Sequence, residues 1–169
     1  MKALSKILFI LIFSISALLF SCKEKVEYPI IPYIEYVNFL KIDNLQNFDD
    51  KGILKFSFTD GDGDIGLAPS DTLYPYNTGS QWYYNLFITY YEKQKGTYVA
   101  VELPMTNNSR IPVVTPHGVN KSIKGDVEIE LNINNYNSPY DTICFDVQIA
   151  DRSLNLSNTI RTPDIIIKK

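Results

Sequence analysis

Three aspartates alternate with glycines in Asp60-Gly61-Asp62-Gly63-Asp64. Glycine tolerates a positive φ, so this segment can curl tightly and bring its carboxylates together. Like charges at close range cost free energy unless a cation or a proton intervenes. Because Ca²⁺ is bound by oxygen ligands at alternating loop positions, the spacing predicts a calcium site. The alternative is an Asp-Gly turn that is simply exposed to solvent.

The sequence around these aspartates does not fit the helix-loop-helix calcium hand. Asp71 falls at the twelfth position counted from Asp60, but Ile65 occupies the sixth position, where that motif requires glycine. The segment before the aspartates has the pattern of a strand, and Pro69 interrupts the segment after them. A calcium site here would therefore lie in a loop between strands.

Other residues that carry reactive chemistry are scarce. The chain has one histidine, His117, which we expect to lie on a surface loop, and two cysteines. Cys144 lies in an apolar run and is predicted to be a buried structural thiol. No serine-hydrolase elbow, zinc-protease motif or phosphate-binding loop occurs. We therefore expect neither nucleophilic catalysis nor zinc chemistry, and no enzyme activity.

An aromatic cluster precedes and enters a predicted strand at 82–91. Strict alternation along it gives a core face, with Trp82 as a buried tryptophan, made of Trp82, Tyr84, Leu86, Ile88 and Tyr90. The opposite face carries Tyr83, Phe87 and Tyr91. Exposed aromatic rings stack on sugars or anchor partner proteins, so these three are candidate ligand contacts. The alternative is ordinary packing on the sheet.

Short segments rich in β-branched and aromatic residues must position these side chains. Apolar residues alternate or run continuously, without a helical period, in segments 34–42, 53–58, 82–91, 98–103, 127–133, 142–150 and 159–167. Residues 92–97 and 151–158 are predicted to join strands as hairpins, and two long loops cover 59–81 and 104–124. About seven such strands indicate an all-β fold, an antiparallel β-sandwich.

The N-terminus carries a different pattern. Lys2 and Lys6 precede an apolar run at 7–20, which is too short to span a bilayer of roughly 30 Å. The run ends in Leu19-Phe20-Ser21-Cys22, which resembles the bacterial lipobox. The resemblance implies a signal peptide at 1–21, lipidation of Cys22, a tether at 22–33 and a domain at 34–169. An uncleaved membrane helix or an ordinary secretory signal is the alternative.

The residues after the lipobox indicate where the protein is located, and its net charge limits the kind of partner it binds. Lys23-Glu24-Lys25 follows the lipobox and is either an export signal for the outer face or a charged tether. We expect an outer-membrane lipoprotein, with the leaflet left open. The net charge of −3 becomes more negative once the two signal-peptide lysines are removed. A mildly acidic domain of this kind gives no reason to expect nucleic acid as a partner.

Two further segments carry a resemblance. Phe56-Ser57-Phe58-Thr59-Asp60-Gly61-Asp62-Gly63-Asp64-Ile65-Gly66-Leu67 resembles a signature of uncharacterised bacteroidete-type lipoproteins. Asp151-Arg152-Ser153-Leu154-Asn155-Leu156-Ser157-Asn158 resembles the last hairpin of bacterial immunoglobulin-like domains. Together they imply an immunoglobulin-like or fibronectin-type sandwich and no particular activity.

The topology of such a sandwich places the loops after the second and sixth strands at one end. We therefore expect the acidic loop to meet the last hairpin, which gives a predicted Ca²⁺ ligand set of Asp60, Asp62, Asp64, Asp151 and Asn155, with Asp62, Asp64 and Asp151 as its core. The first strand would begin at this end, and the C-terminus would lie at the opposite end.

The sequence favours a lipid-anchored interaction module of the cell envelope that binds protein or glycan. The alternative is a structural or assembly lipoprotein whose acidic loop only stabilises the fold, as a turn or as a Ca²⁺ site. Calcium is the one cofactor that the residues suggest, and the membrane, through Cys22, is the first expected partner. The oligomeric state stays open.

Overall fold

The computed structural model describes residues 27–42, 45, 47–114 and 121–169. The predicted signal peptide, Cys22 and His117 lie outside these residues. Within them, no helix has the length and apolar character needed to cross a membrane.

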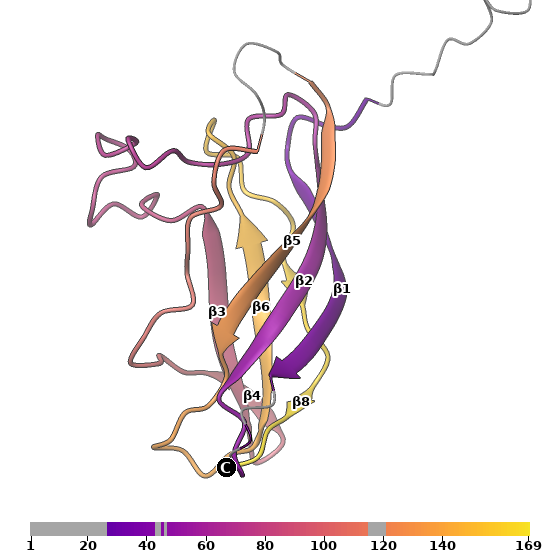
Figure 1. Cartoon of the computed structure of the whole chain (residues 1–169), viewed down its shortest axis with the longest axis vertical. Helices are drawn as coiled ribbons and strands as arrows, with labels where there is room; N and C mark the ends of the chain where they lie inside the picture. Colours follow the sequence, from indigo (N-terminus) through magenta and orange to yellow (C-terminus); the bar gives the residue numbers. More distant parts are fainter. Residues whose placement is uncertain (1–26, 43–44, 46, 115–120) are drawn as a thin grey trace, which may run out of the picture.

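The described chain is all-β, as predicted, and its strands form two antiparallel sheets (Figure 1). The first sheet has the order β1-β2-β5, and the second has the order β4-β3-β6-β7, with β8 also paired to β6. The strands are β1 (Tyr33–Ile42), β2 (Lys51–Asp60), β3 (Leu86–Gln94), β4 (Thr97–Ala100), β5 (Ile123–Asn132), β6 (Thr142–Ile149), β7 (Ile160–Arg161) and β8 (Ile165–Ile166).

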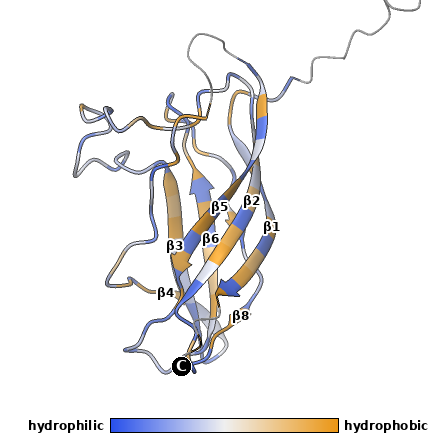
Figure 2. Ribbon diagram, viewed as in Figure 1, coloured by the Kyte–Doolittle hydropathy of each residue, from blue (hydrophilic) through white to orange (hydrophobic). Residues whose placement is uncertain are grey.

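β2 lies at the centre of the first sheet, paired with β1 and β5, and its alternating side chains bury one of its faces. Leu54, Phe56 and Phe58 point inward and are buried, while the residues between them are only partly covered. Lys55 lies on the opposite face between two carboxylates of β5, 3.2 Å from Asp126 and 3.0 Å from Glu128. Figure 2 shows this alternation of hydrophobic and hydrophilic residues along the strands.

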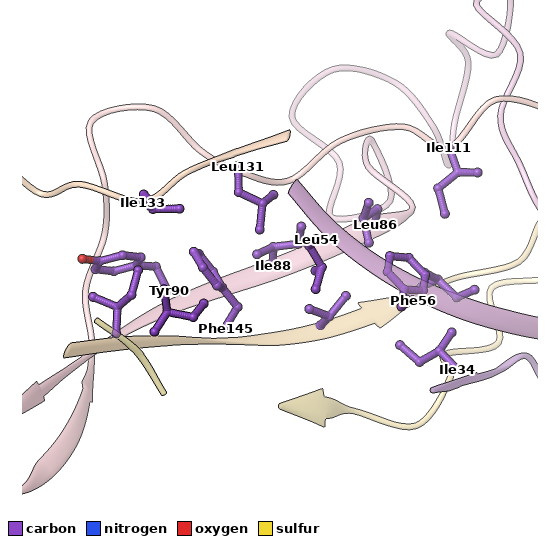
Figure 3. Close-up of a cluster of buried hydrophobic side chains, with 14 of the residues drawn as sticks. Ile34, Leu54, Phe56, Leu86, Ile88, Tyr90, Ile111, Leu131, Ile133 and Phe145 are labelled. Atoms are coloured by element: carbon purple, nitrogen blue, oxygen red, sulfur yellow. The ribbon is translucent and has the colours of Figure 1, made fainter. Parts of the chain in front are cut away.

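The core lies between the two sheets and is built from both inner faces (Figure 3). Phe56 of β2 and Phe145 of β6 are fully buried, and the Tyr90 ring packs edge-on against Phe145 at a centroid distance of 5.6 Å. Burial of each large apolar side chain contributes roughly 1.5–3 kcal/mol to folding. Cys144 is a buried free thiol, as predicted, and burial raises its pKa.

The predicted start of the third strand is wrong. β3 begins at Leu86, and the chain before it forms turns, in which Tyr83 N donates to Ser80 O at 3.1 Å. Alternation therefore does not extend back to Trp82. That side chain is only half-buried and packs against Phe87, with ring centroids 6.3 Å apart, instead of joining the core. β4 is also shorter than predicted and ends at Ala100.

The predicted last strand at 159–167 is divided into β7 and β8. β7 pairs Arg161 with Asp146, whereas β8 pairs Ile165 with Ile143, so one extra residue has been inserted between the two pairings. Pro163 lies at the insertion and cannot donate a hydrogen bond to the ladder, which favours a bulge there. The bulge places Asp164 within 2.8 Å of Lys93.

One side chain joins the two sheets at the end of the sandwich where β1 begins. Asn158 Oδ1 accepts from Ile34 N at 2.8 Å, and Asn158 Nδ2 donates to Ile34 O at 2.9 Å. Ile34 is fully buried, so its backbone groups depend on this amide for partners. The Asn158 side chain therefore pairs with β1 as a neighbouring strand would.

We expect Asn158→Ala to lower the free energy of unfolding by about 2 kcal/mol, because two buried backbone groups lose their partner. Denaturant unfolding measures the change. The matched control is Asn137→Ala, at an exposed turn residue, which should change stability by less than about 0.5 kcal/mol. Equal losses in the two variants would contradict this role of Asn158.

Candidate metal centre

The acidic loop begins where β2 ends. Asp60 is the last residue of β2, and its Oδ2 accepts from Asp64 N at 3.0 Å, which closes the turn. Gly63 has φ 72°, the left-handed region that favours glycine. A side chain at Gly61 would lie 2.4 Å from Tyr28 O, so this glycine lets the incoming N-terminal segment pass directly over the loop.

The hairpin that follows β6 approaches this loop from the second sheet. Asp151 forms an isolated β-bridge with Ile65, and Arg152 N donates to Asp64 O at 3.3 Å. Asn155 fixes the Asp151 carboxylate, because its backbone N donates to Oδ1 at 2.7 Å and its Nδ2 donates to Oδ2 at 2.8 Å. The two predicted loops therefore meet at one end of the sandwich (Figure 1).

Three carboxylates gather at this meeting point. One oxygen from each of Asp60, Asp64 and Asp151 lies within 4.8 Å of the others. Asp60 is 0% exposed and Asp151 is 2% exposed. Within the described part of the chain, three buried oxygens of the loop accept no hydrogen bond: Oδ1 of Asp60, Asp62 and Asp64.

Burial and crowding disfavour the charged forms of Asp60, Asp62 and Asp151. Burial, and then the charges of Asp62 and Asp64, raise the pKa of Asp60 to about 7. Burial also raises the pKa of Asp151, although its hydrogen bonds from Asn155 act in the opposite direction. The pKa of Asp62 is raised by burial and by Asp64. Asp62 lies outside the closest group of three, in which Asp60 takes the place that the sequence predicted for Asp62.

The neighbouring cation does not neutralise the cluster. Arg152 Nη1 lies 2.6 Å from Asp71 Oδ2, and this guanidinium lowers the pKa of Asp71. None of the ion pairs among the described residues involves the four clustered aspartates. Asp71, the residue at the twelfth position, therefore pairs with arginine at the side of the cluster.

Comparisons with family models, with curated proteins and with solved structures find no match for this chain. What the site can bind must therefore be inferred from its own side chains and distances.

The spacing of the three carboxylates suits one calcium ion. Ca²⁺ binds oxygen at about 2.3–2.6 Å, so two oxygens on opposite sides of one ion are separated by about twice that distance. A group confined to 4.8 Å fits this limit. Mg²⁺ binds oxygen at about 2.0–2.1 Å, so oxygens on opposite sides of that ion are only about 4.0–4.2 Å apart, and it is usually held by one or two carboxylates and several waters. The donor set consists of carboxylate oxygens, and a hard cation prefers oxygen ligands.

Some residues of the centre were not predicted from the sequence. Ser153 Oγ donates to Asp64 Oδ2 at 2.9 Å, and Tyr76 Oη donates to Arg152 O at 2.5 Å. Asn155 belongs to the predicted set, but it meets the cluster as the hydrogen-bond donor that positions Asp151. The nearest sequence signal for Ser153 was its place in the hairpin beside Asp151.

The three aromatic residues predicted as ligand contacts do not form one patch. Tyr83 lies before β3, beside Tyr84 at a ring-centroid distance of 4.8 Å. Tyr91 lies under the guanidinium of Arg161 at 4.7 Å. Phe87 is on the same outer face of β3 as Tyr91, but its neighbour is Trp82.

Proposed function

We propose that this chain is a calcium-binding, lipid-anchored β-sandwich of the immunoglobulin-like type, which acts as an interaction module of the cell envelope. The observation that carries the calcium part is the fully buried Asp60. Its Oδ1 has no hydrogen-bond partner among the described residues, and it belongs to a group of three carboxylates. A buried charge without a partner costs several kcal/mol, which a bound cation removes.

The place of the site in the fold supports a structural role for the ion. Asp60 and Asp64 belong to the loop after β2, while Asp151 belongs to the hairpin after β6. An ion bound by both would fasten the two sheets at the end where the N-terminal segment enters. Tyr28 N donates to Ser122 Oγ at 3.1 Å, so this segment is part of the same end. The lipid anchor at Cys22 precedes it in the chain.

Calcium titration of a soluble form that begins at residue 23 tests the proposal. We expect one ion per chain with a dissociation constant on the order of 10⁻⁴ M, as in extracellular calcium modules. Calcium at 100 times this constant stabilises the folded state by about 2.7 kcal/mol. For a chain of this size, the melting temperature should rise by about 8 °C. Mg²⁺ at the same concentration should produce a much smaller rise.

Two variants make the titration specific to the cluster. Asp151→Asn should abolish the heat of binding and the thermal response, whereas Asp126→Asn, an exposed carboxylate of β5, should preserve both. The proposal is overturned if the wild-type chain shows no response at 10 mM Ca²⁺, a concentration of about 100 times the expected constant. It is also overturned if Asp151→Asn responds as fully as the wild-type chain.

A further inference from the structure

A second feature of interest is a small cavity on the outer face of the second sheet, which is shallow and wide open to solvent. It has a volume of about 170 Å³ and is lined by Gln81, Trp82, Phe87, Gln148 and Leu156. Phe87 of β3 and Gln148 of β6 are direct cross-strand partners, and together they form its floor. Trp82 stands beside Phe87, with the two ring planes at 73°.

The walls of the cavity come from the two loops that meet at the acidic cluster. Gln81 and Trp82 end the long loop that starts with the aspartates, and Leu156 belongs to the hairpin that carries Asp151. The ion pair between Asp71 and Arg152 holds that loop against that hairpin. The cavity is therefore a built feature of the fold, with its walls fastened to each other.

The chemistry of the lining selects a neutral ligand that has both apolar faces and hydrogen-bonding groups. None of the five lining residues is charged. Trp82 and Phe87 offer ring surfaces, and Leu156, which is 43% exposed, adds an apolar edge. Gln148 Nε2 donates to Ser157 O at 3.1 Å, which leaves its other N–H and its carbonyl oxygen for a ligand. Gln81 is exposed and offers a second amide.

We propose that this cavity binds a single neutral sugar ring of a glycan, stacked on Trp82 and Phe87 and hydrogen-bonded to Gln81 and Gln148. The C–H face of a pyranose matches an aromatic ring, and its hydroxyl groups match the donors and acceptors of the two amides. The volume lies below the roughly 300–1,000 Å³ of pockets for drug-sized ligands, which limits the occupant to about one ring. This inference rests on the proposed function and names the ligand class of the interaction module.

The affinity of one ring should be low. A hexose has about 12 non-hydrogen atoms, and about 0.3 kcal/mol per atom gives a dissociation constant in the millimolar range. Longer glycans that place further sugars along the sheet should bind more tightly.

Trp82 makes the test direct, because it is the only tryptophan of the chain. The soluble form, with saturating Ca²⁺, is titrated with the methyl glycosides of glucose, galactose, mannose and N-acetylglucosamine while tryptophan emission is recorded. At least one glycoside should produce a saturable change. Phe87→Leu and Gln81→Ala should each weaken that binding at least fivefold. The matched control Tyr74→Ala, at an 88% exposed tyrosine of the same loop, should leave it unchanged.

Gln81→Ala keeps the test valid if Phe87→Leu fails to fold, because Gln81 is an exposed loop residue. No saturable change with any of the four glycosides at tens of millimolar would overturn the inference. Binding of p-cresol without any glycoside would also overturn it, because the cavity would then fit the aromatic side chain of a partner protein. Calcium uptake without glycoside binding defeats this inference alone, whereas glycoside binding without calcium uptake defeats the proposed calcium site alone.

Discussion

In calcium-free buffer at pH 8, the Asp60→Asn variant should unfold about 10 °C above the wild-type chain, although the same substitution removes the response to calcium. The pKa of Asp60, raised to about 7 by burial and by its acidic neighbours, means that the folded state carries an unfavourable charge at this pH. Asparagine has nearly the same shape and no charge. Its Oδ1 can still accept from Asp64 N, and its amide can donate to the neighbouring carboxylates.

The size of this effect follows from the shift in pKa. A rise in the pKa of Asp60 from its ordinary value of 3.8 to about 7 corresponds to on the order of 4 kcal/mol of lost stability once both states are ionised. With 2–4 °C per kcal/mol for a domain of this size, the rise is about 10 °C. A gain in stability together with a loss of the calcium response would show that the charge of Asp60 serves a ligand and not the fold.

Thermal unfolding in calcium-free buffer measures the gain in stability. Thermal unfolding in 10 mM Ca²⁺, roughly 100 times the expected dissociation constant, measures the loss of the calcium response. Asp126→Asn is the control, since its carboxylate is exposed on β5, and it should differ little from the wild-type chain in either buffer. A lower melting temperature for Asp60→Asn without calcium would contradict the assignment, and so would a calcium response of wild-type size.

The second large effect is a dependence of stability on pH that calcium reverses. Without calcium, the folded chain holds a proton on Asp60 up to about pH 7, whereas the unfolded chain releases it near pH 4. The stabilisation is complete below pH 4 and is lost as the pH rises through about 7. The free energy of unfolding should therefore fall by on the order of 4 kcal/mol between pH 4.5 and pH 8.

Asp62 and Asp151, which lie near Asp60, act in the same direction. Asp62, Asp64 and Asp151 surround it, and the pKa values of Asp62 and Asp151 are also raised. By contrast, ion pairs lower the pKa values of Asp49 and Asp71, so their contribution to stability is lost only as the pH falls below about 4. The loss of stability from Asp60 therefore occurs above about pH 4, whereas the loss from Asp49 and Asp71 occurs below it.

Saturating calcium should abolish the fall or turn it into a rise, because the ion competes with the proton and binds the ionised carboxylates. Urea unfolding at a series of pH values, with and without calcium, gives both curves. Asp60→Asn should flatten the calcium-free curve. A calcium-free free energy of unfolding that increases steadily from pH 4.5 to pH 8 would rule out a buried, protonated Asp60.

The meeting of the acidic loop and the last hairpin was predictable from the sequence, because it depends only on the order of strands in an antiparallel sandwich. Period-two alternation predicted the bounds of β2 and β5 to within a few residues, because one face of each strand is buried. Trp82 was misplaced because its apolar neighbours continue the alternation of β3 through a segment that forms turns. Periodicity records which residues are apolar, and it does not record where backbone pairing begins.

The cavity was beyond sequence analysis for a related reason. Its floor pairs Phe87 with Gln148, which are distant in the chain and meet only through the register of β3 and β6. Its walls form only because the long loop packs against the last hairpin. Individual contacts hold the loop there, such as the ion pair between Asp71 and Arg152 and the hydrogen bond from Tyr76 Oη to Arg152 O. Similarly, the hydrogen bonds from Asn155 to Asp151 and from Ser153 to Asp64 depend on the local geometry of the hairpin, which residue spacing does not predict.

If Cys22 carries the proposed lipid anchor, the docking of the N-terminal segment on the domain sets how far the domain lies from the membrane. Tyr28 already contacts the domain, through Ser122 and over Gly61. With Cys22 as the lipidated residue, the intervening stretch covers at most about 20 Å, against about 35 Å for the whole segment up to Pro32. A folded domain of 100 residues has a radius of gyration of about 13 Å and does not fit in so narrow a gap. The proposed anchor would therefore leave room for ions and single sugars in the gap, and protein partners would have to approach from the sides or from the end that carries Lys168.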